Sequence, residues 1–172
     1  STDSATLINK IYEVIEAKNI FNIDYKSIEI LIHPKSYVHA ILKFNNGLTK
    51  IIVHDTTMEI PIFNTLFLNN SKKLGSKKIN LVLLNNLNFK KVDPKRFPMI
   101  KLLNYLPKKN SLFETVIVAA NDKLVELFLE NKIKFIDIQK KLFKIIQNKK
   151  FLKYKYIYAN NFQEIVDLND YV

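Results

Sequence analysis

The sequence predicts an α+β fold, and two patterns along the chain support this prediction. Apolar residues recur with helical spacing near the start of the chain and again from Asp93 to its end. Between these regions, residues 27–54 contain runs rich in β-branched residues, which a turn signal interrupts. We therefore expect a helix and a mixed or antiparallel sheet, followed by a linker and a small C-terminal helical bundle. With 172 residues, 48% of them hydrophobic, the chain can bury the core of one ordinary domain or two small ones.

The first predicted element is a helix over residues 4–19. Apolar residues recur there every three or four positions, beginning at Leu7, and polar residues occupy the opposite face. Asp3 or Ser4 is expected to cap the helix, because a short polar side chain can accept a hydrogen bond from the first turn.

A β-hairpin and a short helix are predicted next. The sequence Asn45-Asn46-Gly47 is typical of a tight hairpin turn, and apolar runs flank it on both sides. Pro61 begins a short apolar helix over residues 62–68, since proline suits the first turn of a helix. The predicted strands cover residues 27–33, 37–44 and 48–54.

The second half of the chain is expected to be mainly helical. Residues 69–78 are polar, contain two lysine pairs, and are predicted to begin a linker as a solvated loop. Residues 79–92 are expected to be extended, with a short strand near residues 87–90. Helical patterns follow, and the predicted helices cover residues 94–106, 111–131, 137–148 and 161–170.

Composition and charge exclude several classes of function. The net charge is +11, but Arg96 is the only arginine, whereas nucleic-acid readers depend on the bidentate arginine fork. No apolar run approaches the length of about 20 residues that a membrane span needs, and residues 1–10 do not resemble a secretory signal. The lack of cysteine excludes disulfide and thiolate chemistry and fits a reducing compartment. We therefore expect a cytoplasmic protein without nucleic-acid or membrane partners.

Familiar catalytic and metal-binding motifs are missing from the sequence. The three histidines, His33, His39 and His54, are too dispersed to indicate a metal site. There is also no glycine-rich phosphate loop, no nucleophile elbow and no zinc-protease motif. These absences leave only a basic α+β protein as the interpretation.

The opening helix carries a more informative set of polar residues. Ser4 and Thr6 offer hydroxyl groups near a helix start, and Asn9 and Lys10 follow within two turns. Glu13 lies within reach of Lys10 and on the same face as Asn9. A hydroxyl, an amide, an ammonium group and a carboxylate thus meet on one edge, which suits a phosphorylated substrate with metal-bound oxygens. The alternative is a capped helix with a solvated face and one surface salt bridge.

The same segment resembles a known enzyme family. Residues 1–10, STDSATLINK, are similar to the (S)xDSATxxNK segment of the 1-deoxy-D-xylulose 5-phosphate reductoisomerase family. The string IHPKSYVH at residues 32–39 is similar to the family's IHPQSxxHS. The ordered likeness covers nearly the whole chain. Further similar segments are residues 58–62, 88–89, 97–102, 119–122, 128–129 and 133–138.

The resemblance implies an NADPH-dependent oxidoreductase of non-mevalonate isoprenoid biosynthesis, which rearranges and reduces 1-deoxy-D-xylulose 5-phosphate to 2-C-methyl-D-erythritol 4-phosphate. Ser4, Asn9 and Lys10 would bind the substrate phosphate. Glu13 would be the catalytic residue, a ligand of Mg²⁺ or Mn²⁺ that also contacts the substrate. Met58 would lie near the nicotinamide of the NADPH cofactor, and the resemblance also implies a homodimer.

The resemblance also implies that the chain corresponds to the C-terminal part of the enzyme. Residues 1–72 would form the C-terminal half of the catalytic domain, 73–93 the linker and 94–172 the C-terminal helical domain. The NADPH-binding half and most of the metal carboxylates would lie outside this chain, so we expect it to be inactive alone. Ser36 and His39 would line the pocket less directly.

Two departures from the family pattern affect the expected site. Thr56-Thr57 replaces the usual Pro-Asp before the methionine, and Asp122 stands where glutamate is usual. An alternative from another class also stays open, namely a free-standing lysine-rich module that binds anions or nucleic acid without catalysis. An open edge at Glu13 would favour the enzyme, whereas a blocked edge with lysines clustered on one face would favour the module.

Overall fold

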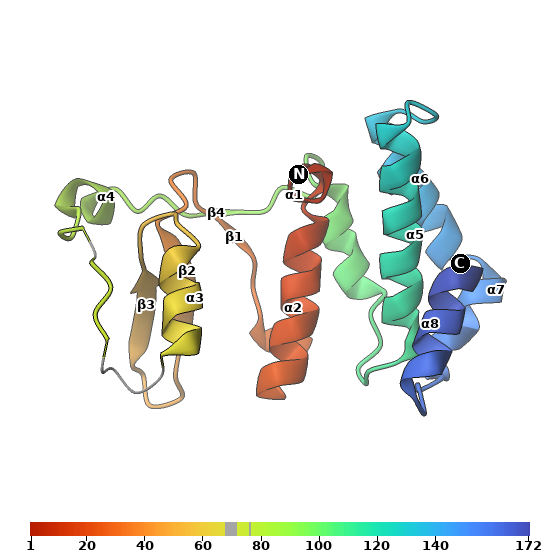
Figure 1. Cartoon of the computed structure of the whole chain (residues 1–172), viewed down its shortest axis with the longest axis horizontal. Coiled ribbons are helices and arrows are strands. Elements are labelled where there is room, and N and C mark those ends of the chain that lie inside the picture. The colour runs from red at the N-terminus through yellow and green to blue at the C-terminus, as the bar shows by residue number, and fades with distance from the viewer. Residues whose placement is uncertain (68–71, 76) are drawn as a thin grey trace. The chain divides into compact units, whose positions relative to one another are not determined.

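The computed structural model describes residues 1–67, 72–75 and 77–172 and divides into two compact units. The first unit contains residues 1–30 and 92–172, and the second contains residues 31–91. Figure 1 allows each element to be followed along the chain. The first unit is helical and the second contains all the strands, so the predicted α+β class is confirmed.

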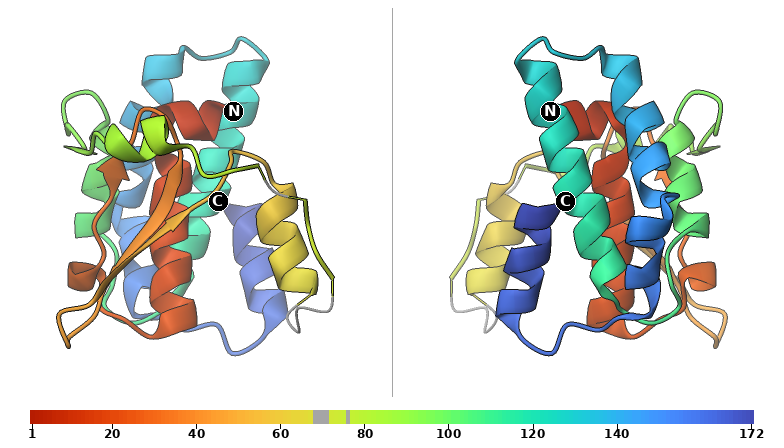
Figure 2. Two further views of the ribbon diagram at one scale, coloured as in Figure 1. Left: turned by 90° about the vertical axis from the view of Figure 1, so that its left-hand side faces the viewer. Right: turned by 90° about the vertical axis from the view of Figure 1, so that its right-hand side faces the viewer.

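The first unit contains six α-helices and three short 3-10 helices. In α5 the side chain of Ser111 accepts a hydrogen bond from the Phe113 N–H, and the Glu114 carboxylate accepts from the Ser111 N–H, which completes a capping box. Figure 2 shows α5 running alongside α6 and α8. The α-helices are α1 (Thr2–Thr6), α2 (Ile8–Phe21), α5 (Leu112–Leu129), α6 (Phe135–Ile146), α7 (Lys149–Leu152) and α8 (Phe162–Tyr171). The 3-10 helices are Tyr25–Ser27, Pro98–Asn104 and Lys153–Tyr156.

One hydrophobic core joins the opening helix to the C-terminal helices. Ile8 and Ile11 of α2 are fully buried against residues of α5, α6 and the 3-10 helix Pro98–Asn104. Burial of each such side chain contributes about 1.5–3 kcal/mol. The opening helix is therefore held by the helical region that begins about 90 residues later in the sequence. The other members of this core are Met99, Leu102, Phe113, Ile117, Ala120, Leu124, Ile138, Leu142 and Ile146.

The opening helix differs from the prediction in two ways. It is broken at Leu7, which has φ 70° and ψ 10° in the left-handed region, so that α1 and α2 are separate helices. Ser1, and not Asp3 or Ser4, is the N-cap, because its Oγ accepts a hydrogen bond from the Ser4 N–H at 3.2 Å. Periodicity could not reveal the break, since the apolar spacing continues through it and only tertiary contacts can hold leucine in this conformation.

The second unit contains two antiparallel strand pairs. In the predicted hairpin, β2 (Val38–Lys43) pairs with β3 (Thr49–Val53), with Ile41 opposite Ile51. Gly47 has φ 87° in the connecting turn, so the predicted turn is confirmed. The other pair is formed by β1 (Leu31–Ile32) and β4 (Lys90–Lys91).

Several predicted boundaries in and around the second unit are wrong. The first strand is shorter than predicted, because residues 25–27 form a 3-10 turn. Residues 81–85 form α4 (Leu81–Asn85), not an extended segment, since the Asn80 side chain caps it by accepting from the Leu83 N–H at 3.0 Å. The short apolar helix α3 spans Glu59–Leu66, whereas the prediction was 62–68. Residue 68, at the end of that predicted helix, lies outside the described residues. So do residues 69–71 and 76 of the predicted linker.

The predicted C-terminal helices differ less from the structure. The helices predicted over 111–131, 137–148 and 161–170 are confirmed as α5, α6 and α8, whereas 94–106 forms a 3-10 helix only over Pro98–Asn104. Two residues explain why this helix is shorter than predicted. The Asp93 side chain accepts a hydrogen bond from the Lys95 N–H, and Pro98 begins the tighter 3-10 helix.

Across the described ranges, no helix is long and apolar enough to cross a bilayer. The predicted domain division at residues 72/73 and 93/94 stays a prediction.

Candidate functional site

The break at Leu7 brings Ser4 and Asn9 together. Asn9 Nδ2 donates a hydrogen bond to Ser4 Oγ at 3.1 Å, and Ser4 Oγ lies 3.1 Å from Ser1 Oγ. In an unbroken helix, residues five positions apart differ in direction by about 140° and do not meet. The left-handed turn therefore creates a polar edge that helical spacing alone would not produce.

Lys10 and Glu13 form an ion pair on the next turn of α2. Lys10 Nζ lies 2.7 Å from Glu13 Oε1 and 2.9 Å from Oε2, as the three-residue spacing predicts. The two side chains are 50% and 56% exposed. An exposed pair of this kind contributes about 0–1 kcal/mol, so an incoming ligand can separate it at low cost. Both charged groups therefore remain available to a ligand, and the Glu13 edge is open.

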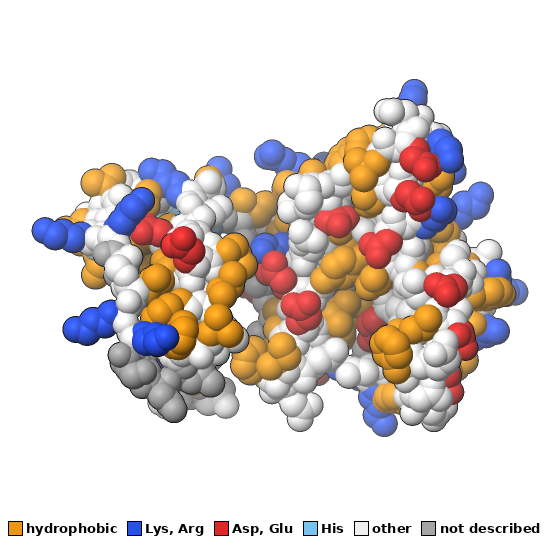
Figure 3. Space-filling view, in the orientation of Figure 1, with side chains coloured by type: hydrophobic (Ala, Val, Ile, Leu, Met, Phe, Trp, Pro, Cys, Tyr) orange, Lys and Arg blue, Asp and Glu red, His pale blue; other side chains and the backbone are white. Residues whose placement is uncertain are grey.

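The charge distribution around this edge is mixed. In Figure 3, acidic side chains lie on the visible face of α2 and α5, while lysines lie mostly toward the edges of the first unit. Nucleic-acid interfaces usually present a continuous basic surface. This face of the first unit therefore lacks the clustered lysines that would favour a lysine-rich binding module.

A buried polar group lies beneath the polar edge. Asn121 of α5 is 0% exposed, and its Nδ2 donates a hydrogen bond to Asp3 Oδ1 of α1 at 3.0 Å. Burial, together with the negative charges of Asp122 and Asp3, raises the pKa of the Tyr12 hydroxyl on α2, which therefore stays protonated. The family-like segment 119–122 includes Asn121, but the sequence assigned it no role, although an amide in the middle of an apolar helix face was an available signal.

A complete metal site does not form within the part of the chain that the structure describes. There, no three His, Cys, Asp or Glu side chains lie close enough to hold a metal ion. Glu13 offers one hard oxygen donor group of the kind that Mg²⁺ and Mn²⁺ prefer. His39 and His54 stack with ring centroids 3.6 Å apart, and His33 packs against Phe89.

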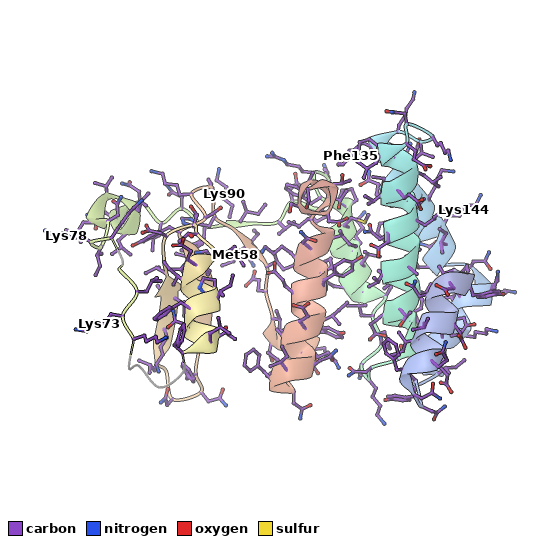
Figure 4. The ribbon with its side chains drawn as sticks, viewed as in Figure 1. Met58, Lys73, Lys78, Lys90, Phe135 and Lys144 are labelled. Carbon is purple, nitrogen blue, oxygen red and sulfur yellow. The ribbon has the colours of Figure 1, made fainter. Side chains whose placement is uncertain are left out.

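Met58 belongs to the second unit, immediately before α3 (Figure 4). Its side chain is 70% exposed and lines an open, largely apolar pocket of about 420 Å³ with Phe63 and Leu66. Ser36 has φ 49° in a tight turn after His33, and His39 Nε2 lies 3.2 Å from the His54 carbonyl oxygen. Met58, Ser36 and His39 belong to the second unit. Ser4, Asn9, Lys10 and Glu13 belong to the first unit, which brings them onto one edge.

Comparisons with known proteins agree on one family. A family model described as the DXP reductoisomerase C-terminal domain matches residues 54–172. A 1-deoxy-D-xylulose 5-phosphate reductoisomerase of Pelagibacter ubique is 62% identical over 170 residues, which cover 99% of this chain and 44% of that protein. A reductoisomerase of Sulfurihydrogenibium sp. is 40% identical, over 80% of this chain and 37% of that protein. The chain thus spans less than half the length of these relatives.

Solved structures show the same likeness. A reductoisomerase from Zymomonas mobilis in complex with NADPH is 28% identical, with a TM-score of 0.86, over 99% of this chain and 44% of that chain. A DOX-P reductoisomerase structure with fosmidomycin and magnesium is 26% identical, with a TM-score of 0.88, over 99% of this chain and 43% of that chain. The fold of this chain therefore matches the corresponding part of these proteins.

Proposed function

The chain belongs to the 1-deoxy-D-xylulose 5-phosphate reductoisomerase family, and we propose that it provides the phosphate-binding edge and one metal ligand of that enzyme. The proposed reaction is the NADPH-dependent conversion of 1-deoxy-D-xylulose 5-phosphate to 2-C-methyl-D-erythritol 4-phosphate. The observation that carries the proposal is the meeting of Ser4, Asn9, Lys10 and Glu13 on one exposed edge.

Ser4, Asn9 and Lys10 together match the chemistry of a phosphate group. Lys10 supplies a positive charge, and its ammonium group can donate to the phosphate oxygens. Asn9 donates to Ser4 Oγ, which leaves the Ser4 hydroxyl proton for Ser1 or for a phosphate oxygen. The three side chains would bind and orient one end of the substrate.

Glu13 would hold the divalent cation, Mg²⁺ or Mn²⁺, with ligands from outside this chain. The bound cation would stabilise negative charge that develops on the substrate oxygens during the rearrangement. Binding requires Lys10 and Glu13 to separate, with Lys10 moving to the phosphate and Glu13 to the cation. The exposed position of the pair supports this exchange, because its separation costs little.

We further infer a cytoplasmic homodimer whose NADPH site lies mainly outside this chain, with Met58 near the nicotinamide. The 62% identity to a reductoisomerase supports the shared activity, and the NADPH complex of a related structure supports the cofactor. The exposed apolar hairpin at Ile41 and Ile51 suits a contact with a second copy. A chain without a dinucleotide site should show no turnover by itself.

The test is a chimaera in which this chain replaces the matching 44% of the Pelagibacter ubique relative. We expect NADPH oxidation that depends on both the sugar phosphate and Mg²⁺ or Mn²⁺, and none from this chain alone. A folded chimaera, verified by circular dichroism, that lacks this activity would contradict the proposed function. Turnover by the chain alone would contradict the proposed location of the NADPH site.

A further inference from the structure

The orientation of α1 is not set by a continuous helix. α1 has five residues and is joined to α2 through Leu7, which has φ 70°. A leucine in the left-handed region is strained and persists only where the surrounding structure holds it. Ser4 and Asn9 lie on opposite sides of this break, so their contact depends on whatever holds α1 in place.

Asn121 holds α1 from a distant part of the chain. Its Nδ2 donates to Asp3 Oδ1 at 3.0 Å, although the two residues are 118 positions apart. Asn121 is fully buried among the apolar residues of α5, where an amide without a partner would lose its hydrogen bonds to water. A carboxylate oxygen accepts a stronger hydrogen bond from an amide N–H than a neutral oxygen does.

The Asn121 side chain also approaches Tyr12 of α2. Asn121 Oδ1 and the Tyr12 hydroxyl are both buried without a hydrogen-bond partner. The Asn121 side chain lowers the pKa of the Tyr12 hydroxyl against the larger effect of burial, so the two groups lie close together. Asn121 therefore lies between Asp3 on one side of the Leu7 break and Tyr12 on the other.

We propose that Asp3 and Asn121 are positioning residues of the phosphate site, which orient α1 so that Ser4 meets Asn9 and the substrate phosphate. The inference rests on the proposed function, because it assigns the polar edge to the phosphate. Neither residue touches the substrate. Both act through Ser4, which directly follows Asp3 in α1.

The kinetic test uses the chimaera with Asp3→Ala. Loss of a charge-assisted hydrogen bond should raise KM for the sugar phosphate about tenfold and leave kcat within about twofold. Asp3→Asn should restore KM, because its amide oxygen can still accept from Asn121. The control is Asp170→Ala, which removes an exposed aspartate of α8 and should leave KM unchanged.

The pairing is tested by combining Asp3→Ala with Asn121→Ala. If the two residues act through one bond, the double variant should have about the KM of Asn121→Ala alone. An unchanged KM in Asp3→Ala, or additive effects in the double variant, would overturn the proposal. Should Asn121→Ala fail to fold, the Asp3 variants still decide the question, since Asp3 lies in the half-buried first turn of α1.

Backbone hydrogen exchange on this chain gives a readout that does not depend on activity. Asp3→Ala should speed exchange in residues 1–7 and leave the amides of α5 as protected as in the unmodified chain. Equal protection of residues 1–7 in both proteins would contradict the positioning role. An inactive unmodified chimaera would instead contradict the proposed function, so the two failures are distinguishable.

Discussion

The two compact units of this chain differ in how they bury apolar side chains. The first unit has a core of buried residues from α2, α5, α6 and the 3-10 helix Pro98–Asn104. In the described residues of the second unit, Tyr37 is the only buried side chain, at 6% exposed, and both strand pairs have only two strands. A two-stranded hairpin is marginally stable without packing partners. The first unit is therefore stabilised by its own core, whereas the second buries too few apolar side chains to be stabilised in the same way.

The hairpin shows this lack of burial most clearly. Its large apolar side chains are 40–49% exposed, on β2, on β3 and on both sides of the turn. An extended apolar surface of this kind is typical of an interface. These side chains are Ile41, Leu42, Phe44, Leu48, Ile51 and Ile52.

The largest expected effect tests the contrast in stability directly. Phe113 is 0% exposed in the first unit, so Phe113→Ala should lower the free energy of unfolding by about 3–5 kcal/mol. Ile41 is 40% exposed, so Ile41→Ala should cost less than about 1 kcal/mol. Urea unfolding followed by far-ultraviolet circular dichroism measures both. Equal losses in the free energy of unfolding for the two variants would show that the two units do not differ in how much their apolar side chains contribute to stability.

The second prediction tests whether the polar edge of the first unit affects catalysis without affecting stability, in contrast to the core. Glu13→Gln keeps the size of the side chain but leaves a neutral, weaker metal ligand. In the chimaera it should lower kcat about 100-fold or more and increase the required Mg²⁺ concentration, with no loss of stability. Glu16→Gln, one turn further along α2 and also exposed, is the matched control. Unchanged kcat and metal dependence for Glu13→Gln would rule out the proposed metal ligand.

A smaller effect is expected from the phosphate end of the same edge. Lys10→Ala removes one charge-assisted contact and should raise KM for the sugar phosphate about tenfold, with a smaller change in kcat. Steady-state kinetics at saturating Mg²⁺ measure the change, and Lys26→Ala removes an exposed lysine as the control. If the main loss is in kcat, Lys10 acts on the reacting part of the substrate instead of on its phosphate.

The smallest effect concerns the carboxylate next to Asn121. Partial burial, and then the charge of Asp3, raises the pKa of Asp122 above its ordinary 3.8. The ionised carboxylate therefore lowers stability at neutral pH, and this cost disappears as the pH falls below 3.8. Asp122→Asn should raise the free energy of unfolding at pH 7 by less than about 0.5 kcal/mol, since solvent screens an exposed group.

Unfolding measured between pH 3 and pH 7 checks this sign, with Asp170→Asn on α8 as the control. The gain from Asp122→Asn should shrink as the solution is acidified. A gain that grows at low pH would contradict the cause assigned to the raised pKa.

Local chemistry allowed several elements to be predicted from the sequence. The Asn45-Asn46-Gly47 turn depends on a residue that tolerates positive φ, and Gly47 has φ 87°. α5 depends on its capping box at Ser111 and on apolar spacing that persists over five turns. The Lys10–Glu13 pair follows from three-residue spacing on one helix. In each case the cause lies within a few residues of the effect.

Other features depend on contacts between distant segments, and the sequence did not reveal them. Helical spacing predicted an unbroken opening helix, whereas Leu7 takes a left-handed conformation that only neighbouring elements can hold. The short pairing of β1 with β4 joins residues about 60 positions apart. The 3-10 helix over Pro98–Asn104, also mispredicted, packs its apolar side chains against α2.

The sequence by itself determined which residues we propose for the chemistry, because the types and order of Ser4, Asn9, Lys10 and Glu13 resemble one family's segment. The tertiary structure decided how these residues meet. Ser4 reaches Asn9 only because the chain breaks at Leu7, and Asp3 of the same short helix is hydrogen-bonded to Asn121. The physical reason is that residue type sets which hydrogen bonds and charges are available, whereas burial against distant segments selects the strained backbone that brings them together.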